Sequence, residues 1–94
     1  MITTKEIIEK LDEAIRKFGT YSLMDKGAYE VMDVSSIANE LCQLSADDAA
    51  QMLIDVDDTH DYGSYLVRDV LMSWDYKGDF KDLLNRYPQL AEYY

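Results

Sequence analysis

The sequence predicts an all-α fold, a small bundle of four to six helices in which residues 1–94 form a single helical domain. Apolar residues recur every three to four positions along most of the chain, which is the spacing of amphipathic helices. The four glycines fall at the ends of the expected helices, where they can stop them. The composition, 48% hydrophobic and 30% charged, is that of a globular domain.

The clearest element is a helix over residues 4–18. Thr3 and Glu6 have the spacing of a capping box, in which each side chain can bond the other residue's backbone N–H. Lys17 lies in the last turn, where a cation suits the helix dipole, and Gly19 can end the helix. The apolar face consists of Ile7, Ile8, Leu11, Ala14, Ile15 and Phe18.

Within residues 19–32, the pattern leaves two alternatives open for the part after Gly27. The stretch between Gly19 and Gly27 is expected to cross the bundle irregularly. Tyr29 and Val31 alternate as in a short strand, whereas a helix over residues 28–44 accounts for the same residues equally well.

Two further helices are expected between residues 33 and 56. Asp33 or Ser35 can cap the first of them, and Cys42 on its apolar side is interpreted as a small buried hydrophobe. Ser45 begins the second, with acidic residues in the first turn where they complement the dipole. The apolar positions of the two helices are Val34, Ile37, Leu41 and Leu44, then Ala49, Met52, Leu53 and Val56.

The segment Asp55–Asp61 reads as a polar connector, and residues 62–74 read as the central helix. Apolar side chains cover more than half of that helix's circumference, which places it in the middle of a bundle. A turn at 75–78 and a cap at Asp79 precede a last helix, which Pro88 ends or kinks. The predicted core contains Ile8, Leu11, Ile15, Leu41, Leu53, Leu66, Val70, Leu71 and Leu84.

A weak internal similarity relates the helices of the second half at a shift of about 30 positions. The segment 48–53 matches 79–84 in its apolar pattern. A short α-solenoid of HEAT-like helix pairs is therefore an alternative arrangement of the same helices.

The chain is strongly acidic, with 9 Lys and Arg against 19 Asp and Glu and a formal net charge of −10. The whole excess lies in residues 25–75, and no basic residue occurs between Lys26 and Arg68. This distribution argues against direct nucleic-acid binding and against binding to anionic membranes, because both require clustered cations.

The remaining composition excludes several classes of site. The single cysteine excludes a disulfide framework and a multi-cysteine zinc site. Neither residues 55–66 nor residues 58–69 match the ligand spacing of a calcium loop, and the one histidine has no nucleophile at a recognisable spacing. We expect no metal, no cofactor, no catalytic residues and no enzymatic activity. No apolar run could span a membrane and no signal peptide is visible, so a cytoplasmic protein is expected.

The acidic segment beside aromatic residues is the candidate partner-binding site. Crowded carboxylates repel one another, and a basic partner would relieve that repulsion. Tyrosines are favoured at interfaces, and the chain contains eight of them. The candidate partner-binding residues are Asp55, Asp57, Asp58, His60, Asp61, Tyr62 and Tyr65.

The chain resembles the immunity proteins of bacterial toxin–immunity systems. The resemblance rests on the helical pattern, on the run without basic residues and on the acidic segment beside aromatic residues. The resemblance implies an inhibitor that covers the positively charged site of a basic toxin, for example a nuclease. A DNA-mimic inhibitor of a nucleic-acid-binding enzyme is a close variant. The alternative is a helical adaptor that binds a partner helix in an apolar groove. The salt dependence of binding distinguishes the inhibitor from the adaptor. Charge-steered association slows as ionic strength rises, whereas binding in an apolar groove should barely change.

Overall fold

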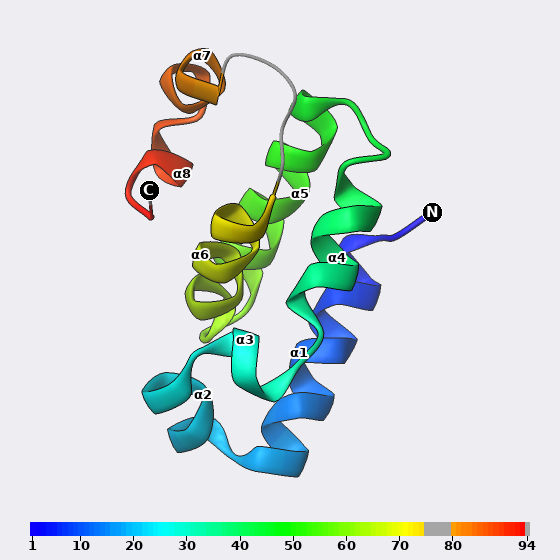
Figure 1. Ribbon diagram of the computed structural model, residues 1–94, viewed down its shortest axis with the longest axis vertical. Helices are drawn as coiled ribbons and strands as arrows, with labels where there is room; N and C mark the ends of the chain where they lie inside the picture. The colour runs from blue at the N-terminus through cyan, green and yellow to red at the C-terminus, as the bar shows by residue number, and fades with distance from the viewer. Residues whose placement is uncertain (75–79, 94) are drawn as a thin grey trace.

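The computed structural model describes residues 1–74 and 80–93, and within them every regular element is a helix (Figure 1). The all-α prediction is therefore confirmed. The helices number eight in the described residues, more than the four to six expected, because the chain between residues 19 and 32 forms two short ones. They are α1 Thr4–Phe18, α2 Thr20–Lys26, α3 Ala28–Val31, α4 Val34–Leu41, α5 Ala46–Thr59, α6 Gly63–Ser73, α7 Phe80–Arg86 and α8 Pro88–Ala91.

Helix α1 has the predicted bounds because the residues that begin and end it are adjacent to it in the sequence. The Thr3 side chain accepts the Glu6 N–H at 3.2 Å, and the Thr3 hydroxyl lies 3.3 Å from a Glu6 carboxylate oxygen. At the other end Gly19 has a φ of 86°, and its N–H donates to the Ile15 carbonyl at 2.8 Å. A positive φ is accessible to glycine without steric cost, so the helix ends there.

Residues 19–32 form α2 and α3, so the expectations of an irregular crossing and of a strand were wrong. A helix does begin at Ala28, as the helical alternative expected, but it ends at Val31 and a separate helix begins at Val34. Gly27 separates the two helices with a φ of 83° and has no side chain that could cap α3. Asp69 of α6 takes that role, because its Oδ2 accepts the Tyr29 N–H at 3.0 Å. A Cβ on Gly27 would lie 3.0 Å from the same oxygen. The cap comes from a residue 40 positions away, which no local pattern reveals.

Helices α4 and α5 begin at side-chain caps. Asp33 accepts the Ser36 N–H and Ser45 accepts the Asp48 N–H, each at 3.1 Å. Cys42 was expected to be buried and is exposed. It is the residue after the last residue of α4, and one helical step of about 100° turns it away from the side on which Leu41 is buried.

Helix α6 is the centre of the bundle, as its apolar circumference predicts. It contacts α1, α3, α4 and α5, and four of its apolar side chains have exposed fractions of 1% or less. Met72 is the exception, at 72% exposed. The first helix contacts both α5 and α6 directly. The arrangement is thus a bundle, whereas in a solenoid each helix pair would contact only its neighbours.

The core is close to the predicted set. Leu11, Leu41, Leu53, Leu66, Val70 and Leu71 are buried as predicted. Ile8, Ile15 and Leu84 are only half-buried and pack at the edge of the core. The positions that the prediction omitted include Ile7, Leu23, Ile37, Leu83 and Leu90, all 1% exposed or less.

The C-terminal helices α7 and α8 pack against each other, and α8 packs against α5. Leu83 and Leu90 anchor them, and Pro88 stands in the first turn of α8, where its missing N–H costs nothing. The predicted turn at 75–78 and the cap at Asp79 lie outside the described residues. None of the helices in the described ranges combines the length and apolarity needed to cross a membrane.

Candidate partner-binding face

The acidic segment is helical for most of its length, so its prediction as a connector was wrong. Helix α5 continues to Thr59, and the His60 N–H closes it on the Val56 carbonyl at 3.0 Å. Val56, in the middle of the acidic run, is fully buried. Burying a valine gains about 1.5–3 kcal/mol, which offsets the roughly 2 kcal/mol that Asp55, Asp57 and Asp58 together cost at about 0.7 kcal/mol each relative to alanine. Packing of the apolar face therefore extends the helix through its acids.

The helical register sorts the acids onto two sides of α5. Asp48, Asp55 and Asp58 are spaced i, i+7 and i+10, lie on one side of the helix and are exposed. We call this set the α5 acidic row. Asp57 lies on the side facing α8 and is half-buried. Asp61 follows in the turn between α5 and α6 and is exposed.

The C-terminal segment supplies hydrogen-bond donors to two of these acids. The Tyr93 hydroxyl lies 2.9 Å from both carboxylate oxygens of Asp57. The Gln89 side-chain amide donates to Asp57 at 2.8 Å and to Asp58 at 2.9 Å. Both donors are neutral, so they satisfy lone pairs of the carboxylates and leave their negative charge in place.

The Tyr93–Asp57 contact makes the free energy of unfolding depend on pH in the alkaline range. Burial, followed by the bond to Asp57, raises the pKa of Tyr93 from 10 to about 12. Because the folded state holds this proton more tightly, the contribution is complete below pH 10 and is lost as the pH rises towards 12. We expect Tyr93→Phe to lower the free energy of unfolding by about 1 kcal/mol at neutral pH and to flatten its decline above pH 10.

Urea unfolding of the parent and of Tyr93→Phe at a series of pH values from about 7 to about 12 measures both effects. Tyr21→Phe is the matched control, because Tyr21 is 79% exposed. Parallel pH profiles for the parent and Tyr93→Phe would contradict the assignment.

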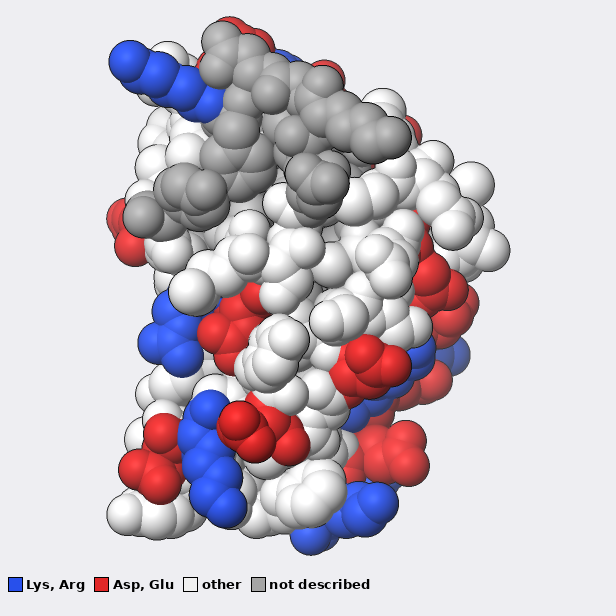
Figure 2. Space-filling view, viewed as in Figure 1, with Lys and Arg blue, Asp and Glu red and all other residues white. Residues whose placement is uncertain are grey.

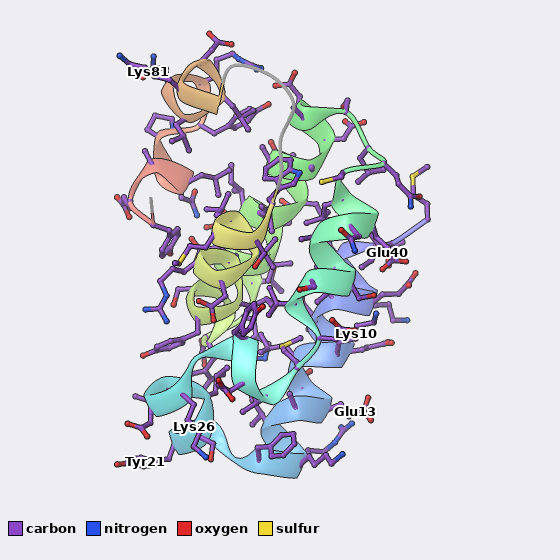
Figure 3. The ribbon with its side chains drawn as sticks, in the orientation of Figure 1. Lys10, Glu13, Tyr21, Lys26, Glu40 and Lys81 are labelled. Atoms are coloured by element: carbon purple, nitrogen blue, oxygen red, sulfur yellow. The ribbon has the colours of Figure 1, made fainter. Side chains whose placement is uncertain are left out.

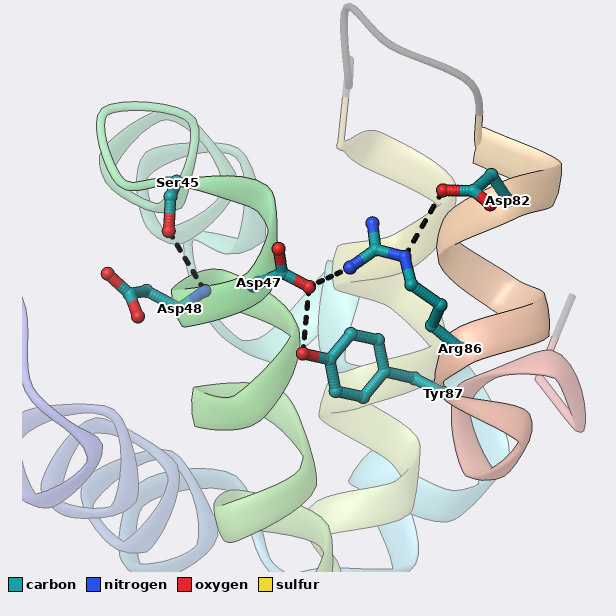
Figure 4. A network of polar contacts seen from close by, with 6 residues as sticks. All are labelled: Ser45, Asp47, Asp48, Asp82, Arg86 and Tyr87. Atoms are coloured by element: carbon teal, nitrogen blue, oxygen red, sulfur yellow. Dashed lines mark hydrogen bonds and ion pairs between the residues drawn. The ribbon is translucent and has the colours of Figure 1, made fainter.

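Asp47 belongs to a second contact with the C-terminal segment (Figure 4). Its Oδ1 pairs with the Arg86 guanidinium and accepts the Tyr87 hydroxyl at 2.8 Å. The Tyr87 bond, reinforced by Arg86, holds the pKa of Asp47 below its ordinary value, and the same bond raises the pKa of Tyr87. Arg86 also pairs with Asp82 one turn earlier at 3.1 Å. Among the residues that the structure describes, Asp47 is thus the α5 acid that forms an ion pair within the molecule.

His60 faces inward, and its side chain is only 14% exposed. Its Nε2 lies 2.6 Å from an Asp12 oxygen of α1, and its Nδ1 accepts the Tyr62 N–H at 3.0 Å. With Nδ1 as an acceptor, the tautomer that satisfies both contacts carries its hydrogen on Nε2 and donates it to Asp12. Both nitrogens are occupied, so the ring fixes the α5–α6 turn against α1.

Tyr62 and Tyr65 are partly buried and pack against the core. Their ring centroids are 6.4 Å apart, within the range of an aromatic pair, and the Arg68 guanidinium lies 6.0 Å from the Tyr65 ring. The seven predicted site residues therefore separate into two groups. Asp55, Asp58 and Asp61 are exposed, whereas Asp57, His60, Tyr62 and Tyr65 are turned wholly or partly into the molecule.

The acids of the α5 acidic row, and Asp61 after them, differ from Asp47 in their ionic contacts. In the described ranges no Lys, Arg or His side chain forms an ion pair with Asp48, Asp55, Asp58 or Asp61. On the face drawn in Figure 2, acidic and basic side chains are interspersed among uncharged ones. Over residues 1–74 and 80–93, no three His, Cys, Asp or Glu side chains are grouped as metal ligands would be.

Among the described residues, open grooves lie on two sides of α1. The first, of about 260 Å³, lies between α1 and the α3–α4 region; Lys10 and Lys17 line it together with Glu13 and Asp33, so its charges offset one another. Lys10 and Glu13 project from α1 in Figure 3, as Tyr21 and Lys26 do from α2. The second groove, of about 290 Å³, lies between the start of α1 and α5 and includes two acids of the row.

Sequence reasoning missed the residues that contact the acidic segment from other helices. No pattern pointed to Asp12 as the partner of His60, or to Arg86, Tyr87, Gln89 and Tyr93 as donors. The contacts of these donors with α5 join residues 31 to 40 positions apart. A hint was available only in composition, because the chain places three tyrosines in its last eight residues.

Comparison of the chain with protein-family models, with curated proteins and with solved structures finds no match in any of the three.

Proposed function

We propose that this chain is a protein-binding inhibitor that uses the α5 acidic row and Asp61 to cover the positively charged site of a basic partner, as an immunity protein covers a toxin such as a nuclease. One observation carries the proposal: Asp48, Asp55 and Asp58 form an exposed row along a helix that contains no basic residue. Among the described residues of the C-terminal segment, the groups that bond Asp57 and Asp58 are the neutral side chains of Gln89 and Tyr93.

The energetics favour such a role for the row. Like charges one to two helical turns apart repel each other in the free protein, and a cationic partner removes that repulsion while forming charge-assisted hydrogen bonds. The same field accelerates encounter with a basic surface, and salt weakens it over about 8–10 Å.

The test uses the product of the gene adjacent to this one. We expect that product to be a basic protein whose toxicity to growing cells is suppressed by coexpression of this chain. Asp58→Asn/Asp61→Asn should slow association several-fold at low ionic strength and have less effect at moderate salt. The matched control is Asp25→Asn/Glu30→Gln, which removes the same charge from exposed positions in α2 and α3.

Two results would contradict the proposal. One is an adjacent product that is not toxic or is not bound. The other is equal slowing by the two double variants, which would mean that net charge alone steers the encounter. Binding that is indifferent to both variants and to salt would favour the helical adaptor.

A further inference from the structure

The groove between the start of α1 and α5 combines apolar and acidic walls. Leu44 and Met52 are half-buried and contribute its apolar surface. Asp48 and Asp55 lie on the exposed side of α5 beside them, and the Gln51 amide lies 3.4 Å from an Asp55 oxygen. Apart from the α-amino group of Met1, no cationic group of the described residues lines this groove.

From this combination we infer that the groove docks an amphipathic helix of a basic protein partner, with two Lys or Arg side chains over Asp48 and Asp55 and an apolar side chain between them over Met52 and Leu44. The inference rests on the proposed function in that it specifies the partner's contact with the same acidic face. It adds a requirement for an apolar residue that charge alone would not impose.

The spacing along α5 argues for a helix as the occupant. Asp48 and Asp55 are seven residues apart, which is two helical turns or about 10 Å of rise, and Met52 lies between them on the same side. A partner helix presents side chains at i and i+7 with the same separation and an apolar side chain at i+3 or i+4. The aliphatic stems of Lys and Arg can cover Met52 while their charged ends reach the carboxylates.

The volume limits what enters. About 290 Å³ accommodates side chains and not a whole helix. The partner helix therefore lies across the opening and inserts its apolar residue and the stems of the two cations. The acids remain at the rim, where their pairs with the partner stay partly hydrated and each contributes modestly.

The experiment measures binding of a fluorescent alanine-based helical peptide, two heptads long, that carries two lysines seven positions apart and two adjacent leucines midway between them. Two control peptides replace both leucines by serine or both lysines by glutamate. We expect the serine peptide to bind at least several-fold more weakly and the glutamate peptide not to bind. On the protein side, Asp48→Asn/Asp55→Asn and Met52→Gln should each weaken binding roughly five- to tenfold.

Asp25→Asn/Glu30→Gln is again the control for loss of charge, and the thermal midpoint of each variant reports whether it is folded. Equal affinity for the leucine and serine peptides would overturn the inference, as would equal weakening by the two charge variants. So would unchanged binding by folded Met52→Gln. This readout is independent of the adjacent-gene test. Peptide binding with no suppression of the adjacent product defeats the proposed function alone, and suppression without groove-dependent peptide binding defeats the groove alone.

Discussion

Leu11→Ala is expected to lower the free energy of unfolding by about 3 kcal/mol, within the range of about 2–5 kcal/mol for leucine truncation in a close-packed core. Leu11 is 0% exposed and lies in α1, which contacts α2, α5 and α6. Alanine leaves a cavity there that surrounding helices can fill only by moving. For a domain of this length the thermal midpoint should fall by roughly 10 °C or more.

Ile15→Ala is the informative comparison for this truncation. The apolar pattern of α1 treats Leu11 and Ile15 as equivalent, whereas the structure leaves Ile15 half-buried at the edge of the core. We therefore expect a loss for Ile15→Ala of about half that for Leu11→Ala, because less apolar area returns to water. Chemical denaturation of both variants measures the difference, and equal losses would contradict the burial described for α1.

The contrast between α1 and the segment 19–32 explains how far the fold could be predicted. The start and end of α1 depend on Thr3, Glu6 and Gly19, which are adjacent to the helix or within it, so the sequence pattern located both ends. The start of α3 depends on Asp69, which the fold brings to Tyr29 from α6. Local patterns therefore predict elements whose ends are stabilised locally and fail where a tertiary contact stabilises the end.

The candidate site shows the same division. The acidic character of residues 25–75 is a property of composition, and it was available at once. Separating the exposed row from the inward Asp57 requires knowing that α5 continues to Thr59. The aspartates made this stretch look like a loop, whereas the burial of Val56 keeps it helical. The donors from the C-terminal segment required knowledge of packing between α5 and α8. The negative charge of the segment could be predicted, but which carboxylates are exposed and which are bonded within the molecule could not.

Gly63→Ala is the second large effect that we expect, and here two physical arguments oppose each other. Gly63 is the first residue of α6 and is buried at a close approach to α5. Helix propensity alone predicts that alanine gains up to about 1 kcal/mol over glycine in a helix. A Cβ at this position, however, would lie 2.5 Å from the Val56 carbonyl oxygen and 3.2 Å from the Asp57 Cα. These are backbone atoms of α5, so the helices must separate to admit a methyl group.

Overpacking of a well-packed core costs about 1–3 kcal/mol, and the displaced elements here are the two helices in contact at the centre of the bundle. We therefore expect Gly63→Ala to destabilise the protein by about 2 kcal/mol in urea unfolding. Gly19→Ala separates this effect from backbone strain, because Gly19 has a φ of 86° but no atom within 4 Å of the point that an added Cβ would occupy. Its expected loss is about 1–3 kcal/mol, from the backbone alone, because a φ of 86° with a ψ of 158° is a conformation that only glycine adopts readily. A Gly63→Ala variant as stable as the parent would mean that α5 and α6 cross farther apart than described, and the turn that holds His60 against Asp12 would then be placed differently too.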